Sequence, residues 1–422
     1  MAAVILFGAF FVLLLLGVPI GYSIGLATLV GILSSGSLPV LSLVQNSITG
    51  VDSFPLMAVP FFMLAGNLMS TGGIAKRIVN FANLLVGKIT GGLSIVTTVS
   101  CMFYAALSGS AIATTSGVGA FMIPAMEEKG YNKGFAASIA AAAGSIGVII
   151  PPSIPFVIYG VTVGASIGDL FIAGILPGIM MGIALIIVCY IYSKKHGYVG
   201  IQEKVTWRKL GKAFVDAIWS LLMPVIILGG IYSGYFTPTE SAVVAVVYCI
   251  IISTCIHREM KLKDIWEAFR STIVVNGTTT FMVAFSMAFA VYLHVESIPT
   301  TIANWMLGIS ENPVVILLMI NLFLLVVGCM IDNIPATIIL SPILLPVVES
   351  LGMSPITFGI MLTMNLAIGF CTPPYGINLF VAAAIADIKV GSMMRSMVWC
   401  LIALLIVLLL ITFVPWFTMG FI

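Results

Sequence analysis

The chain has 422 residues, of which 61% are hydrophobic and 8% are charged, whereas a typical soluble domain is about 25% charged. Its 17 Lys/Arg and 15 Asp/Glu are too few to cover a soluble surface of this size. The formal net charge of +2 by itself says nothing about nucleic acid, and no nucleic-acid partner is expected. Uncharged runs cover residues 1–51, 89–126, 134–168 and 350–386, each long enough to cross a bilayer. The sequence therefore predicts an all-α polytopic membrane protein with no soluble domain.

The first apolar run covers residues 3–33. It is too long for a secretory signal and has no basic leader, so we expect a retained helix that bends near Pro19. Residues 1–75 as a whole are predicted to form N-terminal scaffold helices.

Basic residues gather at 194–213 and 258–270, and the positive-inside rule places both stretches in the cytoplasm. We expect a basic loop at 194–213 and further scaffold helices over 214–295. Between the two scaffold spans, Thr237 and Glu240 are spaced as a capping box around the start of a helix, so Glu240 is predicted to be structural.

Two apolar segments, at about residues 90–128 and 312–350, are too long for one span, yet both ends of each are assigned to the same side. Each is interrupted by small or polar residues, at 107–116 and 328–335. A re-entrant hairpin with its tip near mid-membrane satisfies both facts, because irregular backbone at that depth must lie against protein or a wet cavity.

An internal repeat appears when the chain is shifted by 222 residues, which aligns Pro151-Pro152 with Pro373-Pro374. The paired prolines interrupt helices at about 134–165 and 356–386. Each repeat also begins with an interfacial arm helix. The repeats are expected to occupy residues 76–193 and 296–392, followed by a C-terminal helix over 393–422. Because the two hairpins open to opposite sides, the repeats are predicted to be inverted, as in secondary transporters with a central site.

Five motifs extend over essentially the whole chain: SGSAIATTSGVGAFMIP, IIPPSIPFVIYG, FTPTES, DNIPATIILSPILLP and GFCTPPYGIN. In combination they resemble the large membrane subunit of tripartite ATP-independent periplasmic (TRAP) transporters. The resemblance implies a sodium-driven, elevator-type importer in the bacterial inner membrane, with no cofactor other than the coupling ion. It also implies a small four-helix membrane subunit, expected as a separate chain, and a periplasmic substrate-binding protein. The implied substrates are dicarboxylates, keto acids, sugar acids or sialic acids.

Five residues are candidates for substrate binding. Asp332 carries the only charge between Glu311 and Glu349 and lies at a hairpin tip, although a helix cap would also explain it. Two of the others are serines at the first tip, where close packing of small residues is the alternative explanation, and two are polar residues in or just after the broken segments. They are Ser108, Ser110, Ser153 and Asn378.

Two sodium sites are also expected. The resemblance points to backbone oxygens of Gly328, Gly369, Thr372 and Tyr375 in the second repeat. The shift of 222 residues transfers them to Ala106, Gly147, Ile150 and Ser153 in the first. Sodium favours such oxygen ligands, and no transition-metal site is expected; the alternative is that the glycines only permit close helix packing.

Three other functions remain as alternatives. A stand-alone sodium-coupled dicarboxylate carrier is the nearest. An intramembrane enzyme would need several acidic, His or Cys residues together inside the spans, where Asp332 stands alone. A channel would not require an inverted repeat whose two tips differ.

Overall fold

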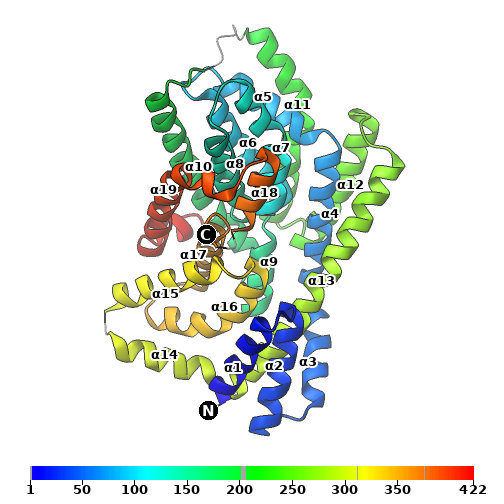
Figure 1. Cartoon of the computed structure of the whole chain (residues 1–422). Helices are drawn as coiled ribbons and strands as arrows, with labels where there is room; N and C mark the ends of the chain where they lie inside the picture. Colours follow the sequence, from blue (N-terminus) through cyan, green and yellow to red (C-terminus); the bar gives the residue numbers. More distant parts are fainter. Residues whose placement is uncertain (1, 201–205, 311, 375) are drawn as a thin grey trace.

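The computed structural model describes residues 2–200, 206–310, 312–374 and 376–422 (Figure 1). Every regular element within these residues is a helix. Seven described helices are long and apolar enough to cross a membrane, and eight shorter ones are also apolar. The predicted all-α polytopic membrane fold is confirmed.

The N-terminal run forms two helices, α1 (Ala2–Leu15) and α2 (Ile20–Ser35), which pack against each other. Between them Gly17 has a φ of 79°, a left-handed conformation that glycine adopts without strain. At about 1.5 Å per residue, neither helix alone crosses a hydrocarbon core of about 30 Å. The prediction of one helix bent near Pro19 is wrong, because the flexible Gly17 precedes the proline and lets the chain fold back.

A scaffold is built around the longest helix, α13, which packs on α2, α3 and α4, while α12 packs on α4 and α11. The Asn67 side-chain amide on α4 donates to the Thr272 hydroxyl on α13 over 2.8 Å. Thr237 and Glu240 form the predicted capping box at the start of α12. The elements are α3 (Leu41–Val51), the 3-10 turn Phe54–Met57, α4 (Ala58–Thr71), α11 (Trp207–Tyr232), α12 (Pro238–Ile251), the π turn Ile252–Ile256 and α13 (Leu262–Val295).

Eight of the remaining helices of the described chain form two matching series of four. In each, two helices are joined by a short tip and are followed by a helix that breaks before a proline pair. The first helix after each tip has 18 residues, and the two start at Ala111 and Asn333, 222 positions apart. The first series is α6 (Gly92–Ser108), α7 (Ala111–Glu128), α8 (Lys133–Gly144, continued by the 3-10 turn Ser145–Val148) and α9 (Ile154–Val163); the second is α15 (Pro313–Gly328), α16 (Asn333–Ser350), α17 (Pro355–Gly369) and α18 (Ile377–Ala386).

Each series is preceded by an amphipathic arm helix, α5 (Ile74–Val86) or α14 (Ile298–Ile309). The arm α5 packs on α6 and α11, whereas α14 packs on α16. In Figure 1, α6 and α7 lie in the upper half of the molecule and α15 and α16 in the lower half. The two arms therefore lie at different levels of the molecule.

Hydrogen bonds join the first series to the second series and to α19. The Tyr159 hydroxyl on α9 donates to the Pro355 carbonyl at the start of α17 over 2.7 Å. The Ser138 hydroxyl on α8 lies 3.0 Å from the Met393 carbonyl and 3.0 Å from the Ser396 hydroxyl. The two series thus form one packed unit together with α10 (Ile167–His196), the 3-10 turn Val390–Ser392, α19 (Met394–Phe413) and α20 (Trp416–Met419).

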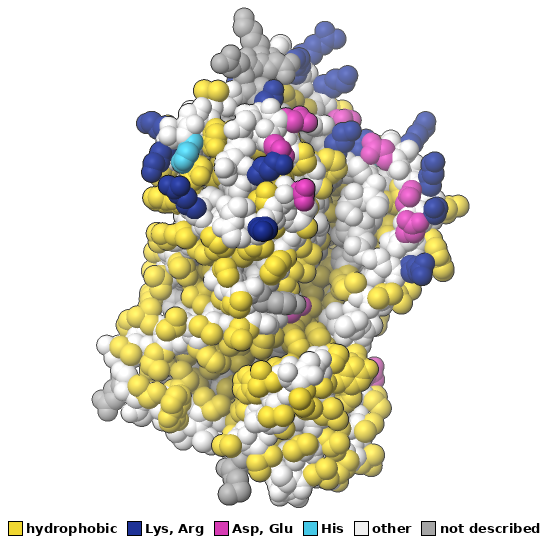
Figure 2. All heavy atoms as spheres, in the orientation of Figure 1, with side chains coloured by type: hydrophobic (Ala, Val, Ile, Leu, Met, Phe, Trp, Pro, Cys, Tyr) yellow, Lys and Arg dark blue, Asp and Glu magenta, His cyan; other side chains and the backbone are white. Residues whose placement is uncertain are grey.

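Charged side chains gather at the upper end of the molecule, which is the end that the basic stretches assign to the cytoplasm (Figure 2). Helices α10 and α11 extend into the segment expected as a basic loop, so Lys195 and Arg208 belong to helix ends. At the same end Arg77 on α5 pairs with Glu259 over 2.7 Å, and this hydrogen bond lowers the pKa of Glu259. The ion pair fastens the first arm helix to the turn before α13.

Candidate functional site

The first hairpin tip consists of Ser108, Gly109 and Ser110. Gly109 has a φ of 61°, and a methyl group built on it would lie 2.7 Å from the Pro152 carbonyl oxygen. Its carbonyl accepts from the Ile154 amide over 3.3 Å. The tip therefore docks backbone to backbone on the break between α8 and α9, which explains why glycine is required there.

The two serines of this tip have different roles. The Ser108 hydroxyl, almost fully buried, lies 2.9 Å from the Thr114 hydroxyl. Ser110 is the N-cap of α7, and its hydroxyl accepts from the Ala113 amide over 3.4 Å. A methyl group built on Gly147 would lie 2.6 Å from the Ser110 carbonyl oxygen. The structure thus brings the tip and Gly147 together.

Ser153 is fully buried at the start of α9. Its hydroxyl donates to the Val148 carbonyl over 2.6 Å and accepts from the Phe156 amide over 3.3 Å, so it caps α9 and closes the break. The Ile150 side chain packs against Gly178 on α10. The described contacts thus place Ser153 and Ile150 around the break. They join neither residue to Ala106, which is half-buried near the end of α6.

Asp332 lies at the second tip as the N-cap of α16. Its Oδ1 accepts from the Asn333 amide over 2.7 Å, and the residue remains half-buried. The Asn333 carbonyl oxygen Oδ1 accepts from the Thr337 hydroxyl over 3.0 Å. Among the described residues, the buried Asn333 Nδ2 has no hydrogen-bond partner. The tip therefore combines a carboxylate with an unpaired amide donor.

The second break follows Gly369, whose backbone packs so tightly on Gly328 that a methyl group on Gly369 would overlap the Gly328 carbonyl. The Thr372 amide donates to the Gly369 carbonyl over 3.0 Å, and its hydroxyl donates to the Ile368 carbonyl over 2.9 Å. Gly328, Gly369 and Thr372 are therefore clustered through backbone contacts. Tyr375, the fourth predicted member, lies outside the described residues.

Asn378 is fully buried at the start of α18. Its Nδ2 donates to the Ala141 carbonyl on α8 over 3.2 Å, and the Cys371 thiol lies 3.3 Å from the same carbonyl. The Asn378 Oδ1 has no partner among the described residues. Asn378 thus lies where the broken helices of the two series cross.

A buried amide pair that the sequence analysis missed lies near the second break. The Asn365 Nδ2 on α17 donates to the Asn321 Oδ1 on α15 over 2.9 Å, and the Asn321 Nδ2 donates to the Thr412 hydroxyl on α19 over 3.3 Å. Asn365 lies one helical turn before Gly369. Single asparagines inside apolar runs were the only available signal, since their pairing is set by tertiary packing.

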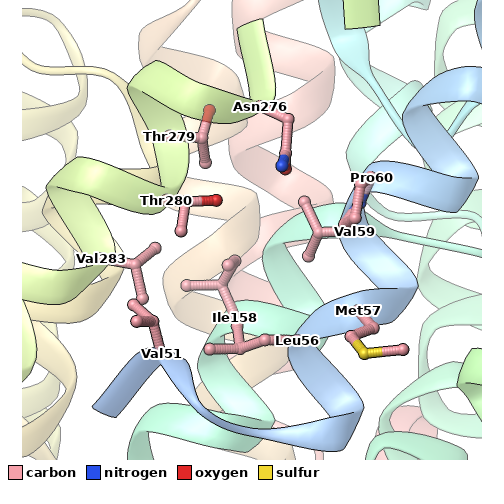
Figure 3. Close-up of a pocket in the computed structure, with 10 residues that line it drawn as sticks. All are labelled: Val51, Leu56, Met57, Val59, Pro60, Ile158, Asn276, Thr279, Thr280 and Val283. Carbon is pink, nitrogen blue, oxygen red and sulfur yellow. The ribbon is translucent and has the colours of Figure 1, made fainter. Parts of the chain in front are cut away.

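A cavity of about 160 Å³ lies between the scaffold and α9 (Figure 3). Asn276, Thr279 and Thr280 of α13 supply most of its polar side chains, and Ile158 of α9 closes it from the opposite side. In Figure 3, Asn276 and Thr280 point toward the space that Ile158 enters. The first series therefore meets the scaffold across a polar strip of α13.

The fold matches that of a known membrane transporter. The structure resembles the crystal structure of the YdaH transporter of Alcanivorax borkumensis with a TM-score of 0.66, at 14% sequence identity, covering 90% of this chain and 88% of that one. The chain thus shares the fold of a membrane transporter.

Family comparison is more specific. The chain belongs to the family described as "Tripartite ATP-independent periplasmic transporter, DctM component", whose model matches residues 7–417. Large permeases of this family are inner-membrane proteins that work with a small membrane subunit and a periplasmic substrate-binding protein. The membership confirms the resemblance that the five motifs indicated.

The names of the relatives give different substrates. The chain is 44% identical, over 99% of its length, to the isethionate TRAP transporter permease protein of Oleidesulfovibrio alaskensis, but it spans only 66% of that protein. It is 39% identical to the sialic acid large permease of Vibrio cholerae, covering 96% of this chain and 95% of that protein. It is also 39% identical to the C4-dicarboxylate large permease of Pseudomonas aeruginosa, covering 90% and 91%.

Proposed function

We propose that this chain imports a small organic acid across the bacterial inner membrane, coupled to inward sodium flow. It would act as the large permease subunit, together with a small membrane subunit and a periplasmic substrate-binding protein. The observation that carries this proposal is the pair of matching series, in which backbone atoms of each hairpin tip or hairpin helix contact the break of a helix. Such breaks expose carbonyl oxygens that suit a hard cation.

The proposal treats the two series as inverted repeats with one cation cage each. Gly328, Gly369 and Thr372 offer clustered backbone and hydroxyl oxygens in the second repeat. In the first repeat, the carbonyl of Ser110 beside Gly147 supports an oxygen-lined site, and the buried Ser153 adds a hydroxyl. Two cations on either side of a central site would offset the cost of placing an organic anion at mid-membrane.

The substrate is proposed to be an anion that carries a carboxylate or sulfonate, since isethionate, sialic acid and C4-dicarboxylates are the substrates named for the relatives. Asp332 would repel such an anion at close range, so it is assigned to a cation or to a substrate hydroxyl. The hydroxyls of Ser108 and Ser110 are assigned to the substrate side of the first tip. Asn378 is expected to hold the two broken helices in register through Ala141.

Transport in proteoliposomes tests the proposal. The chain is reconstituted with both partners, and uptake of each candidate acid is measured with sodium or with potassium outside. Sodium should support saturable uptake, and its replacement by potassium should abolish uptake. Equal uptake under a proton gradient alone would reject sodium coupling. Full uptake without the binding protein would favour the stand-alone carrier.

A further inference from the structure

A groove lies at the cytoplasmic end of the molecule, between the last turns of α10 and the first turns of α19. We call it the α10–α19 groove. It has a volume of about 130 Å³ and faces the outside of the helical unit rather than the contact between the two series. Its lining residues are Val188, Ile191, Tyr192, Lys195, His196, Arg395 and Trp399.

The mouth of this groove is positively charged. Lys195 and Arg395 come from different helices and both are exposed, and neither makes an ion pair within the described part of the chain. The lining includes no carboxylate. Figure 2 shows a histidine among Lys and Arg side chains on this flank of the upper end. Two unpaired cations thus face one small groove.

Aromatic rings lie directly beside the cations. The His196 ring stacks on Tyr192 at 4.1 Å, and Tyr192 stacks on Phe135 at 4.0 Å, which fixes this wall of the groove. On the other wall, Trp399 follows Arg395 by one helical turn and is 50% exposed. Trp and Tyr prefer this position, at the level of lipid headgroups.

Exposed isoleucines continue both walls toward the membrane centre. On α10, Ile191, Ile187 and Ile183 precede Lys195 at intervals of four residues and are 55%, 52% and 52% exposed. On α19, Ile402 and Ile406 continue the face of Arg395 and Trp399 and are 49% and 54% exposed. Residues at such spacing share one face of a helix. Each wall therefore runs from a cation through an aromatic ring to apolar side chains.

We propose that the α10–α19 groove binds an anionic phospholipid of the cytoplasmic leaflet. The phosphate would lie between Lys195 and Arg395, the ester region beside Trp399 and Tyr192, and the acyl chains along the isoleucines. The order of cation, aromatic ring and apolar side chains along the groove matches the order of phosphate, ester region and acyl chains in a phospholipid. A free anion would contact only the cations. Basic pockets between helices on the cytoplasmic side are suited to anionic headgroups. The proposal is independent of the transported substrate.

Native mass spectrometry tests the site. The chain is purified with its membrane partner, stripped of lipid with detergent and titrated with phosphatidylglycerol or with phosphatidylcholine that has the same acyl chains. We expect phosphatidylglycerol to be retained, and the variant Lys195→Gln/Arg395→Gln to weaken its binding about tenfold. The control Lys194→Gln/Lys389→Gln removes two exposed cations from the same end, outside the groove, and should bind as the wild type does.

Trp399 provides a second readout, since a phosphatidylglycerol with brominated chains should quench its fluorescence. The quenched fraction should fall in Trp399→Phe and in the double groove variant. Equal binding of both lipids, or unchanged binding by Lys195→Gln/Arg395→Gln, would overturn the proposal. Displacement of the lipid by inorganic phosphate at equal concentration would assign the groove to a free anion. Binding that occurs only without the small subunit would make the groove a subunit contact, and it too would overturn the proposal.

Discussion

The backbones of Gly328 and Gly369 are in direct contact. The end of α15, the first helix of the second hairpin, therefore lies against the last turn of α17 with no side chain between them. A methyl group on Gly328 would lie 2.9 Å from the Cα of Leu366, which is on α17. Only residues without a Cβ permit this approach. The contact brings the carbonyl of one helix beside the end of another, which is the geometry that a carbonyl-lined cation cage requires.

Gly369→Ala should therefore raise the sodium concentration for half-maximal transport, by at least about fivefold, because the new methyl group overlaps the Gly328 carbonyl. The measurement is uptake in proteoliposomes against sodium concentration. Gly277→Ala is the matched control, since Gly277 also lies in a helix but a methyl group there meets nothing within 4 Å. An unchanged sodium dependence in Gly369→Ala would remove Gly369 from the cage.

Asp332 caps α16 and also carries a negative charge, and two substitutions separate the capping role from the role of the charge. Asn is as good an N-cap as Asp, whereas Ala is not. If the carboxylate takes part in transport, Asp332→Asn should lose at least about tenfold in transport rate, as Asp332→Ala does, while retaining wild-type thermal stability. Normal transport by Asp332→Asn together with a loss in Asp332→Ala would show that Asp332 is only a cap.

The Asn321–Asn365 amide pair should stabilise the second repeat. Asn365→Leu leaves the buried Asn321 Oδ1 with only the longer contact from the Thr412 hydroxyl, at 3.4 Å. We expect it to lower stability by about 1–3 kcal/mol, the usual cost of a buried polar group that loses its partner. Thermal unfolding in detergent measures the change. In the double variant Asn321→Leu/Asn365→Leu the cost should be less than the sum of the single costs; strict additivity would show that the two amides do not interact.

Arg77→Gln should have a small, pH-dependent effect on stability. Arg77 lowers the pKa of Glu259, so the ion pair contributes stability above the unfolded-state pKa of about 4.3 and loses it as pH falls through the lower folded-state pKa. Because Glu259 is 43% exposed, we expect a loss of less than about 1 kcal/mol at pH 7. Unfolding curves for both proteins should converge as the pH falls through the lowered pKa of Glu259. A difference that is constant with pH would contradict the ion pair.

Removal of Arg77 should also raise the pKa of His257. Burial, followed by the charge of Arg77, holds that pKa below its usual value. Titration of the His257 ring by NMR in Arg77→Gln should therefore show an upward shift. An unchanged His257 pKa would leave burial as the whole cause.

Glycines and prolines made the helix breaks predictable, because their effect on the backbone is local. The proline pairs 151–152 and 373–374 follow α8 and α17, and Asp332 is the N-cap of α16, as the helix-cap alternative predicts. The turn at Gly17 was missed because a Gly two positions before a Pro is compatible with both a bend and a reversal of the chain. Local sequence does not decide between them; the packing of α1 on α2 does.

The direction of side chains beyond a break was not predictable. Asn378 follows an irregular segment, which resets the phase of the helix, so its sequence position does not show which way it faces. The sequence makes Asn378 a candidate for substrate binding, and in the structure its amide donates to the Ala141 carbonyl. No sequence pattern indicates that Lys195 and Arg395 line one groove, because the two residues belong to helices that are far apart along the chain. Both depend on how distant helices meet.

The bonds from Tyr159 to Pro355 and from Ser138 to Met393 cross from the first series to the second series and to the residue before α19. Both donors belong to α8 or α9, so the two halves of the first broken helix are each tied to the C-terminal part of the chain. If the two series move relative to α13, both candidate cation cages should consequently move by the same amount. During such a movement, the distance between spin labels on α9 and α17 should stay constant, whereas the distance of each label from the scaffold should change.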